Sequence, residues 1–212
     1  MDIVGKRRIF LTISGVATVI CLVSIILFGF RLSIEFTGGS KLEVASTDGK
    51  SLDVAKIKEI FTNQKIKVVT ITKNSDKDVM IRTDQITDAQ KNQVLAKALE
   101  QKINIKEKSF DTLGPIIGAE TTNNAFKAIG LAILAITLYI AFAFRTVSKP
   151  VSSWKFGISA IIALVHDVII VVGTFSLLGV MFGVEVDVLF ITAVLTIMGF
   201  SVHDTIVVFD RI

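Results

Sequence analysis

The sequence has 212 residues, of which 51% are hydrophobic and 20% are charged, and its formal net charge is +4 at pH 7. Ordinary soluble domains contain about 45–50% apolar residues even with glycine counted, so this composition argues against a purely soluble protein. The positive charge forms no basic stripe interleaved with aromatic side chains, which argues against nucleic acid as a partner.

The charged residues are concentrated between residues 31 and 127, and the rest of the sequence is nearly free of charge. This distribution predicts one membrane domain that is interrupted by one soluble domain. In chain order, we expect a cytoplasmic N-terminus at 1–8, a membrane helix at 9–30, an extracytoplasmic domain at 31–113, a polar or amphipathic connector at 114–124, a membrane helix at 125–144, a cytoplasmic loop at 145–155, a membrane helix at 156–178, an outer loop at 179–187, a membrane helix at 188–209 and a cytoplasmic end at 210–212.

The first apolar segment is predicted to be a membrane helix rather than a cleaved signal peptide. It runs over roughly 22 residues from Ile9 to Phe30, which is long enough to cross a bilayer core of about 30 Å. A signal peptide has a shorter apolar region followed by small residues at a cleavage site, and no such site follows here. Lys6, Arg7 and Arg8 precede the helix and predict a cytoplasmic N-terminus. The single cysteine, Cys21, lies within this segment and is interpreted as a small hydrophobic residue.

Residues 33–40 read SIEFTGGS and contain the glycine pair Gly38-Gly39. Glycine tolerates backbone conformations that other residues avoid, so the pair predicts a sharp turn at the entrance of a strand. The segment has neither the spaced glycines nor the lysine of a phosphate-binding loop.

The soluble domain alternates between strand and helix patterns. Ser51 is expected to begin a helix, and Thr87 with Gln90 forms a capping box before another. Between and around these helices, strand patterns occur at Leu42 and Val44, at 67–72, at 79–83 and at 106–113. The order is β-α-β-β-α-β, the ferredoxin-like α+β arrangement, so the fold class is a polytopic α-helical membrane protein with an extracytoplasmic ferredoxin-like domain. The domain contains no histidine, cysteine or glycine-rich phosphate cradle, and no enzyme activity or cofactor is expected.

Gly114 and Pro115 end the soluble domain, and three further membrane helices follow. Basic residues flank the loop at 145–155, whereas the loop at 179–187 has only acidic charges. Since lysine and arginine favour cytoplasmic loops, we expect both termini inside and the soluble domain outside.

Two His-Asp pairs interrupt the apolar helices: His166-Asp167 in the third and His203-Asp204 in the fourth. A charged side chain at the centre of a membrane helix costs about 2.5–3.5 kcal/mol on insertion scales, so each acid needs a partner, water or a proton. One reading is a proton or ion relay through Asp204 and Asp167, with His203 sharing a proton with Asp204. The other reading is that the acids only lock helix packing. Two His-Asp pairs offer too small a ligand set to favour a metal.

Small and polar residues of the fourth helix share one face. Thr192, Thr196, Gly199 and His203 follow one another at spacings of four, three and four, with Asp204 on the flank. We expect this face to turn inward, toward the other helices or toward a partner.

Four motifs in order resemble the SecF family of membrane subunits, which act with SecD in protein export. They are SIEFTGGS at 33–40, GPIIG at 114–118, ALVHD at 163–167 and GFSVHDTIVVFDRI at 199–212, and they include Gly38, Gly39, Gly114, Pro115, Gly199, Asp210 and Arg211. The last motif is the most specific. The resemblance covers the whole sequence and implies a fold like that of resistance-nodulation-division exporters.

The resemblance also implies partners, a location and a mechanism. The partners would be SecD, the SecYEG channel, preprotein substrates and an additional small membrane subunit or insertase. The protein would lie in the bacterial cytoplasmic (inner) membrane. Proton flow through the membrane acids, with Asp204 in the main position, would shift helix packing and move the outer domain, which would promote preprotein translocation.

The sequence departs from the family pattern in three ways. The family usually has Asp where Glu35 stands and Asn where His203 stands, which puts a titratable group beside Asp204. Family members have six membrane helices and this sequence shows four, so we expect a C-terminally truncated chain. A proton-driven exporter of small molecules or lipids and a non-transporting scaffold remain as alternative functions.

Overall fold

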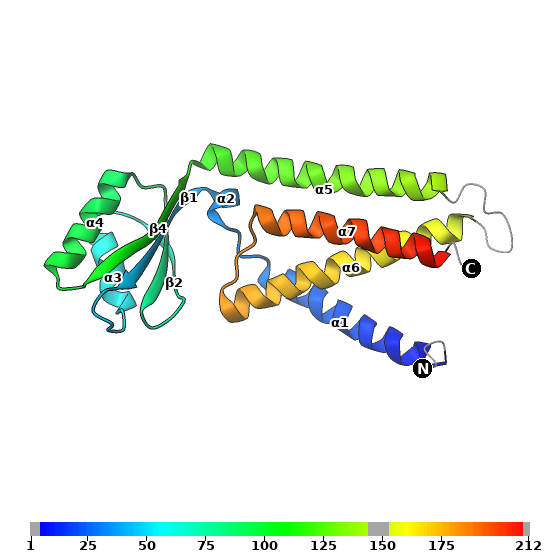
Figure 1. The fold of residues 1–212 in the computed structure, drawn as a ribbon, viewed down its shortest axis with the longest axis horizontal. Helices are drawn as coiled ribbons and strands as arrows, with labels where there is room; N and C mark the ends of the chain where they lie inside the picture. Colours follow the sequence, from blue (N-terminus) through cyan, green and yellow to red (C-terminus); the bar gives the residue numbers. More distant parts are fainter. Residues whose placement is uncertain (1–4, 144–152, 210–212) are drawn as a thin grey trace. The chain divides into compact units, whose positions relative to one another are not determined.

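The computed structural model describes residues 5–143 and 153–209 (Figure 1). It divides into two compact units, a helical unit (Met1–Arg31 and Asn124–Ile212) and an α+β unit (Leu32–Asn123). The motif residues Asp210 and Arg211 and most of the loop predicted at 145–155 lie outside the described residues.

The α+β unit is built on a four-stranded antiparallel sheet with the order β2-β3-β1-β4. Its strands are β1 (Gly39–Ser46), β2 (Val68–Lys73), β3 (Asp78–Thr83) and β4 (Ile105–Leu113). The helix α3 (Val54–Asn63) connects β1 to β2, α4 (Asp88–Glu100) connects β3 to β4, and the short α2 (Ile34–Thr37) precedes β1. Because β1 and β2 are each antiparallel to β3, they run parallel to one another through α3. This topology confirms the predicted ferredoxin-like order.

Both helices of this unit share one hydrophobic core with the sheet, and Figure 1 shows them on the same side of the strands. Alternate residues of β1 point into the core, as the period of a half-buried strand predicts. The most deeply buried side chains of the core are Leu42, Val44, Ile57, Ile60, Phe61, Val79, Ile81, Val94 and Ala98.

The start of α3 differs from the prediction, whereas the start of α4 agrees with it. Asp53, not Ser51, caps α3, and its carboxylate accepts a hydrogen bond of 2.9 Å from the amide of Ala55. The reason is Leu52, which is buried and holds the preceding residue outside the helix, as a hydrophobic residue before an N-cap often does. At α4 the predicted capping box between Thr87 and Gln90 is present.

One lysine of the domain is buried rather than solvated. The Nζ atom of Lys91 lies 2.9 Å from a carboxylate oxygen of Glu107, 3.3 Å from Asp88 and 4.7 Å from the ring centre of Phe110. The hydrogen bond with Glu107 is the main reason that the pKa of Lys91 lies above its ordinary value of 10.5. Lys91 is therefore part of the folded interior of the domain and not of its solvated surface.

Four helices among the described residues are long and apolar enough to cross a membrane. They are α1 (Arg7–Phe28), α5 (Pro115–Ala143), α6 (Ser153–Phe182) and α7 (Val188–Phe209). With the sheet domain they confirm the predicted fold class of a polytopic helical membrane protein.

The helix bounds add detail to two of the predicted connections. The polar segment expected at 114–124 forms the first turns of α5, which starts at Pro115 and continues without a break. Proline suits the first position of a helix, since its fixed φ is helical and its missing N–H is not needed there. The loop expected at 179–187 is shorter, because α6 continues to Phe182. It ends at Gly183, which has a φ of +72° and whose amide bonds the carbonyl of Gly179.

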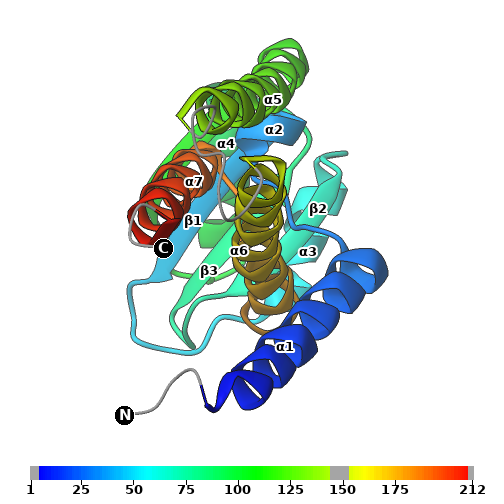
Figure 2. The ribbon, with the colours of Figure 1, turned by 90° about the vertical axis from the view of Figure 1, so that its right-hand side faces the viewer.

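Within the helical unit, α6 lies between α1 and α7 (Figure 2). The amide of Val186 also donates a hydrogen bond of 2.7 Å to the carbonyl of Arg31, just beyond α1. These contacts place both His-Asp pairs on neighbouring helices.

Candidate functional site

Helices α1 and α6 meet along a seam of small and polar residues. The hydroxyl oxygen of Ser14 lies 2.6 Å from Nε2 of His166, and the Ser24 hydroxyl donates to that of Ser176 at 2.9 Å. Both pairs are separated by 152 residues in sequence, so the two helices run parallel in one constant register.

The closest approach of the two helices lies between these two contacts. A Cβ atom at Gly173 would come within 2.2 Å of the Cβ of Cys21, so only glycine fits there. The Ser176 hydroxyl also donates to the carbonyl of Gly29 at 2.8 Å. Small residues and hydroxyl groups are the usual means by which membrane helices pack closely.

The first His-Asp pair belongs to this seam. The Nδ1 atom of His166 lies 2.9 Å from a carboxylate oxygen of Asp167, while Nε2 faces Ser14. The side chains of His166 and Asp167 are 35% and 43% exposed. The sequence indicates the pair but not its serine partner, which lies on a helix 152 residues away.

Helix α7 packs on α6 through an apolar face. Phe190, Val194, Met198 and Val202 are buried, and the rings of Phe175 and Phe190 have centroids 4.3 Å apart. The face predicted to turn inward is instead exposed in this chain, with Thr192, Thr196, Gly199 and His203 on it. The threonine hydroxyls bond only carbonyls of their own helix. Within this chain the face does not form the contact with α6, because larger apolar side chains occupy it, which leaves the alternative that the face turns toward a partner.

The second His-Asp pair lies on this exposed side. The side chains of His203 and Asp204 are 75% and 84% exposed, and Nδ1 of His203 lies 3.7 Å from the nearest Asp204 oxygen. That separation is too long for a hydrogen bond. Among the described residues, no hydrogen bond joins Asp204 to another helix, in contrast to the bonded pair on α6.

The two acids lie at different depths. Helices α6 and α7 run in opposite directions, and the contact of Phe175 with Phe190 fixes their register. Asp204 then lies level with about residue 161, so it is roughly six residues, or about 9 Å along the helix axis, from the level of Asp167. No hydrogen bond or ion pair between described residues connects the two pairs.

The glycine motifs meet in the α+β unit. Gly38 and Gly39 have φ values of +70° and +108° and form the sharp turn between α2 and β1. A Cβ atom at Gly38 would lie 2.7 Å from Cα of Pro115, and one at Gly118 would lie 2.7 Å from the amide nitrogen of Gly38. The two motifs, distant in sequence, are therefore in direct backbone contact.

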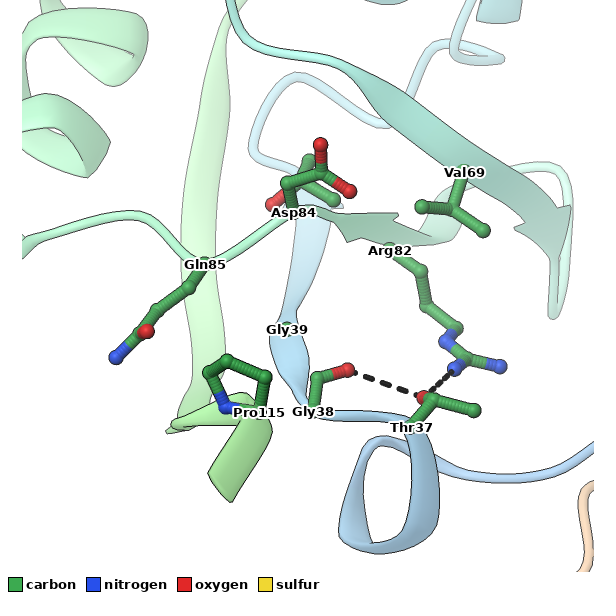
Figure 3. A pocket seen from close by; sticks show the side chains of 9 residues that line it. Thr37, Gly38, Gly39, Val69, Arg82, Asp84, Gln85 and Pro115 are labelled. Atoms are coloured by element: carbon green, nitrogen blue, oxygen red, sulfur yellow. Dashed lines mark hydrogen bonds between the residues drawn. The ribbon is translucent and has the colours of Figure 1, made fainter. Parts of the chain in front are cut away.

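Arg82 lies beside this junction and was not identified from the sequence. Its guanidinium donates hydrogen bonds of 2.7 Å to the carbonyl of Leu32 and 3.0 Å to the hydroxyl of Thr37. It borders a hollow of about 390 Å³ (Figure 3). The hollow is lined by Thr37, Gly38, Gly39, Val69, Arg82, Thr83, Asp84, Gln85 and Pro115. The available signal was an arginine within a strand whose other residues are mostly apolar.

No three His, Cys, Asp or Glu side chains gather closely enough to hold a metal ion in the ranges that the structure describes. The polar side chains described above in the helical unit are carboxylates, imidazoles and hydroxyls. Carboxylates and imidazoles can exchange protons, whereas serine and threonine hydroxyls donate and accept hydrogen bonds.

Comparison with known proteins connects both regions to one family. Residues 91–212 match the family "Protein export membrane protein SecD/SecF, C-terminal", and residues 23–48 match the "SecD/SecF GG Motif". The chain is 41% identical over 222 residues to a protein translocase subunit SecF of Thermobaculum terrenum and 36% identical over 214 residues to that of Anaerolinea thermophila. In both comparisons the match covers all of this chain, and it covers 69% and 68% of the two relatives.

A solved structure shows the same arrangement. The crystal structure of SecDF, a translocon-associated membrane protein from Thermus thermophilus, superposes with a TM-score of 0.77 at 27% identity. The match covers all of this chain and 27% of the SecDF chain. A structure of SecDF in the super-membrane-facing form gives a TM-score of 0.58. The chain therefore belongs to the SecD/SecF family of protein-export membrane proteins, among the SecF-type translocase subunits.

Proposed function

We propose that this chain acts with a SecD partner to promote preprotein translocation across the bacterial inner membrane, driven by the proton gradient. The names of its relatives support a role in protein export. The observation that carries the proton-coupled part is Asp204, which is 84% exposed on an apolar helix that can span a membrane.

An acid in that position requires either a partner or a proton. Leaving it charged toward lipid costs about 2.5–3.5 kcal/mol on insertion scales. Among the described residues, no hydrogen bond from Asp204 to another helix supports a packing role, and Nδ1 of the neighbouring His203 is 3.7 Å away. Asp204 therefore suits a site that faces a partner helix and changes charge during the transport cycle.

The roles of the polar groups then differ. Asp204 is the main proton acceptor, His203 is a second titratable group beside it that comes within sharing distance only if one of the two side chains turns, and Asp167 is the acid of a second, bonded pair. Moving one charge across the membrane potential is worth about 2.3 kcal/mol per 100 mV, which is enough to bias two arrangements of packed helices. Protonation of Asp204 would change how α7 packs on its partner.

The orientation follows from the charges next to the helices. Lys6, Arg7 and Arg8 precede α1, and a cytoplasmic N-terminus is the arrangement that such residues favour. The sheet domain is then extracytoplasmic, on the side where a preprotein emerges. The partners are SecD, the SecYEG channel and the preprotein, together with an additional small membrane subunit or insertase. The chain has a transport role, and we assign it no catalytic step.

The test is preprotein export into inverted membrane vesicles with and without a proton gradient. The full-length protein carries Asp204→Asn, and Asp111→Asn, at an exposed position of β4, serves as the matched control. We expect the Asp204 variant to assemble with its partner, to retain export without the gradient and to lose the stimulation by the gradient. Undiminished stimulation in the Asp204 variant would refute the proton-coupling role of this residue.

A further inference from the structure

We propose that His166 is a second proton-holding group of the transport cycle, and that Ser14 and Asp167 are the residues that position it. The proposal rests on the proposed function. It is carried by a hydrogen-bonded row that crosses from α1 to α6: the Ser14 hydroxyl, both nitrogens of His166 and the Asp167 carboxylate, at 2.6 and 2.9 Å.

The row determines which nitrogen changes its protonation. An ionised carboxylate only accepts hydrogen bonds, so the Nδ1 atom facing Asp167 carries a hydrogen. Nε2 is then free of hydrogen in the neutral ring and accepts the Ser14 O–H. A proton that binds at Nε2 converts the imidazole to imidazolium, whose charge is balanced by Asp167. Release of that proton from Nε2 restores the neutral ring.

Ser14 fits both states of the ring, because a hydroxyl both donates and accepts. When Nε2 becomes a donor, the oxygen of Ser14 accepts from it, and the hydroxyl hydrogen must turn to another acceptor. A serine in a helix can use the carbonyl four residues earlier. The hydroxyls of Thr12 and Thr18 on the same helix already bond in this way, to the carbonyls of Arg8 and Ser14. The α1–α6 contact therefore survives the change of charge.

The same seam shows that a hydrogen bond that only joins the two helices does not require histidine. Ten residues further along each helix, Ser24 and Ser176 close the seam with two hydroxyls that are only 2% exposed. At His166 the seam is not closed, because over a third of the imidazole is left uncovered by the described helices. Burial and chemistry thus distinguish the structural hydrogen bond between Ser24 and Ser176 from the titratable group at His166.

Few other charges act on this imidazole. Helix α1 has no Asp, Glu, Lys, Arg or His after Arg8, and its remaining titratable group is the thiol of Cys21. On α6 the charged groups are Asp167 and Lys155, and on α7 the titratable groups are His203 and Asp204. Of these groups, Asp167 lies within hydrogen-bonding distance of the imidazole, so it sets the balance of charge at His166.

The first measurement follows the titration of His166 by ¹⁵N-histidine NMR in the full-length protein with its partner. The difference from His166→Gln identifies its signal. We expect the ¹⁵N signals of His166 to report a proton binding at Nε2, the nitrogen that faces Ser14. Ser14→Ala should change its proton affinity roughly 2- to 12-fold, the range expected for one hydrogen bond. Thr12→Ala, which removes a hydroxyl bonded only within α1, should leave the titration unchanged.

The second measurement is the pH profile of gradient-stimulated export. His166→Gln should lose most of the stimulation, Ser14→Ala should shift the profile in the direction of the NMR change, and Ser14→Thr should restore it. Unchanged profiles in Ser14→Ala and His166→Gln would overturn the proposal, as would a His166 that does not titrate. If His166→Gln fails to assemble with its partner, the comparison of the pH profiles of Ser14→Ala and its control Thr12→Ala decides whether the proposal holds. Asp204→Asn could lose the stimulation by the gradient while the His166 and Ser14 variants keep normal stimulation. That result would support the proposed function and would refute the role of His166.

Discussion

Gly173 of α6 lies so close to Cys21 of α1 that any side chain at position 173 would overlap the cysteine, with Cβ atoms 2.2 Å apart. The packing of α1 on α6 thus depends on glycine at position 173, whose side chain is a hydrogen atom where every other residue has a Cβ atom. Because Cys21 is the only cysteine of the sequence and is buried, it also reports on this contact.

Gly173→Ala should separate the two helices. Overpacking of a close contact typically costs about 1–3 kcal/mol, and here the overlap is with backbone as well as side chain. We expect a lower melting temperature and faster alkylation of Cys21 by a membrane-permeable maleimide. Gly157→Ala on the same helix is the control, since no atom lies within 4 Å of its added Cβ. Equal labelling rates in the two variants would contradict the observed contact.

Gly118→Ala should disturb the junction of the two glycine motifs. Its Cβ would lie 2.7 Å from the Gly38 nitrogen and 3.0 Å from the Phe36 carbonyl, and backbone atoms cannot move aside easily. We expect a loss of roughly 1–3 kcal/mol in the free energy of unfolding, measured by chemical denaturation in detergent. Gly130→Ala, in open space on the same helix, should be neutral or slightly stabilising. A destabilisation shared by both variants would point to α5 rather than to the junction.

Arg82→Met should loosen the segment that leads from α1 into the sheet. The substitution keeps the aliphatic length but removes the donors to the Leu32 carbonyl and the Thr37 hydroxyl. Each hydrogen bond from a charged group contributes roughly 1.5–3 kcal/mol, so for two bonds we expect a destabilisation of about 3–6 kcal/mol and faster amide exchange near Thr37. Lys56→Met, on the exposed side of α3, controls for loss of a charge. Unaltered exchange at Thr37 would show that Arg82 does not hold this segment.

Lys91 should make the stability of the sheet domain fall at high pH. Its folded-state pKa lies above the ordinary 10.5, mainly because of Glu107, so folding favours the protonated amine. This contribution is fully present below pH 10.5 and is lost as the pH rises through the folded-state pKa. Melting temperatures between about pH 8 and 11.5 should decline less steeply in Lys91→Met than in the wild-type protein. Lys50→Met, with its exposed amine, should follow the wild-type slope.

The order of helices and strands could be predicted because each of these elements depends on a sequence pattern of a few neighbouring residues. The glycine pair, the capping box at Thr87 and the alternating pattern of β1 each act over a few residues. The His-Asp pairs were visible for the same reason, since a charge within an apolar run stands out.

The contacts between segments could not be predicted from local patterns. That Ser14 meets His166 depends on the register of two helices far apart in sequence, and nothing in either helix specifies its partner. Which face of α7 meets α6 could not be predicted either, because both its apolar residues, such as Phe190, and its small polar residues are suited to helix packing. The role of Arg82 likewise depends on where the chain returns after α1.

The constant offset of 152 residues along α1 and α6 has a practical consequence for measuring motion in this protein. Two helices joined at Ser14, at Cys21 and at Ser24 cannot slide past one another without breaking every contact of the seam together. Spin labels placed on their outer surfaces should therefore keep a fixed separation throughout transport, whatever the gradient. The α1–α6 pair thus provides a fixed reference distance, against which the displacement of any other helix can be measured.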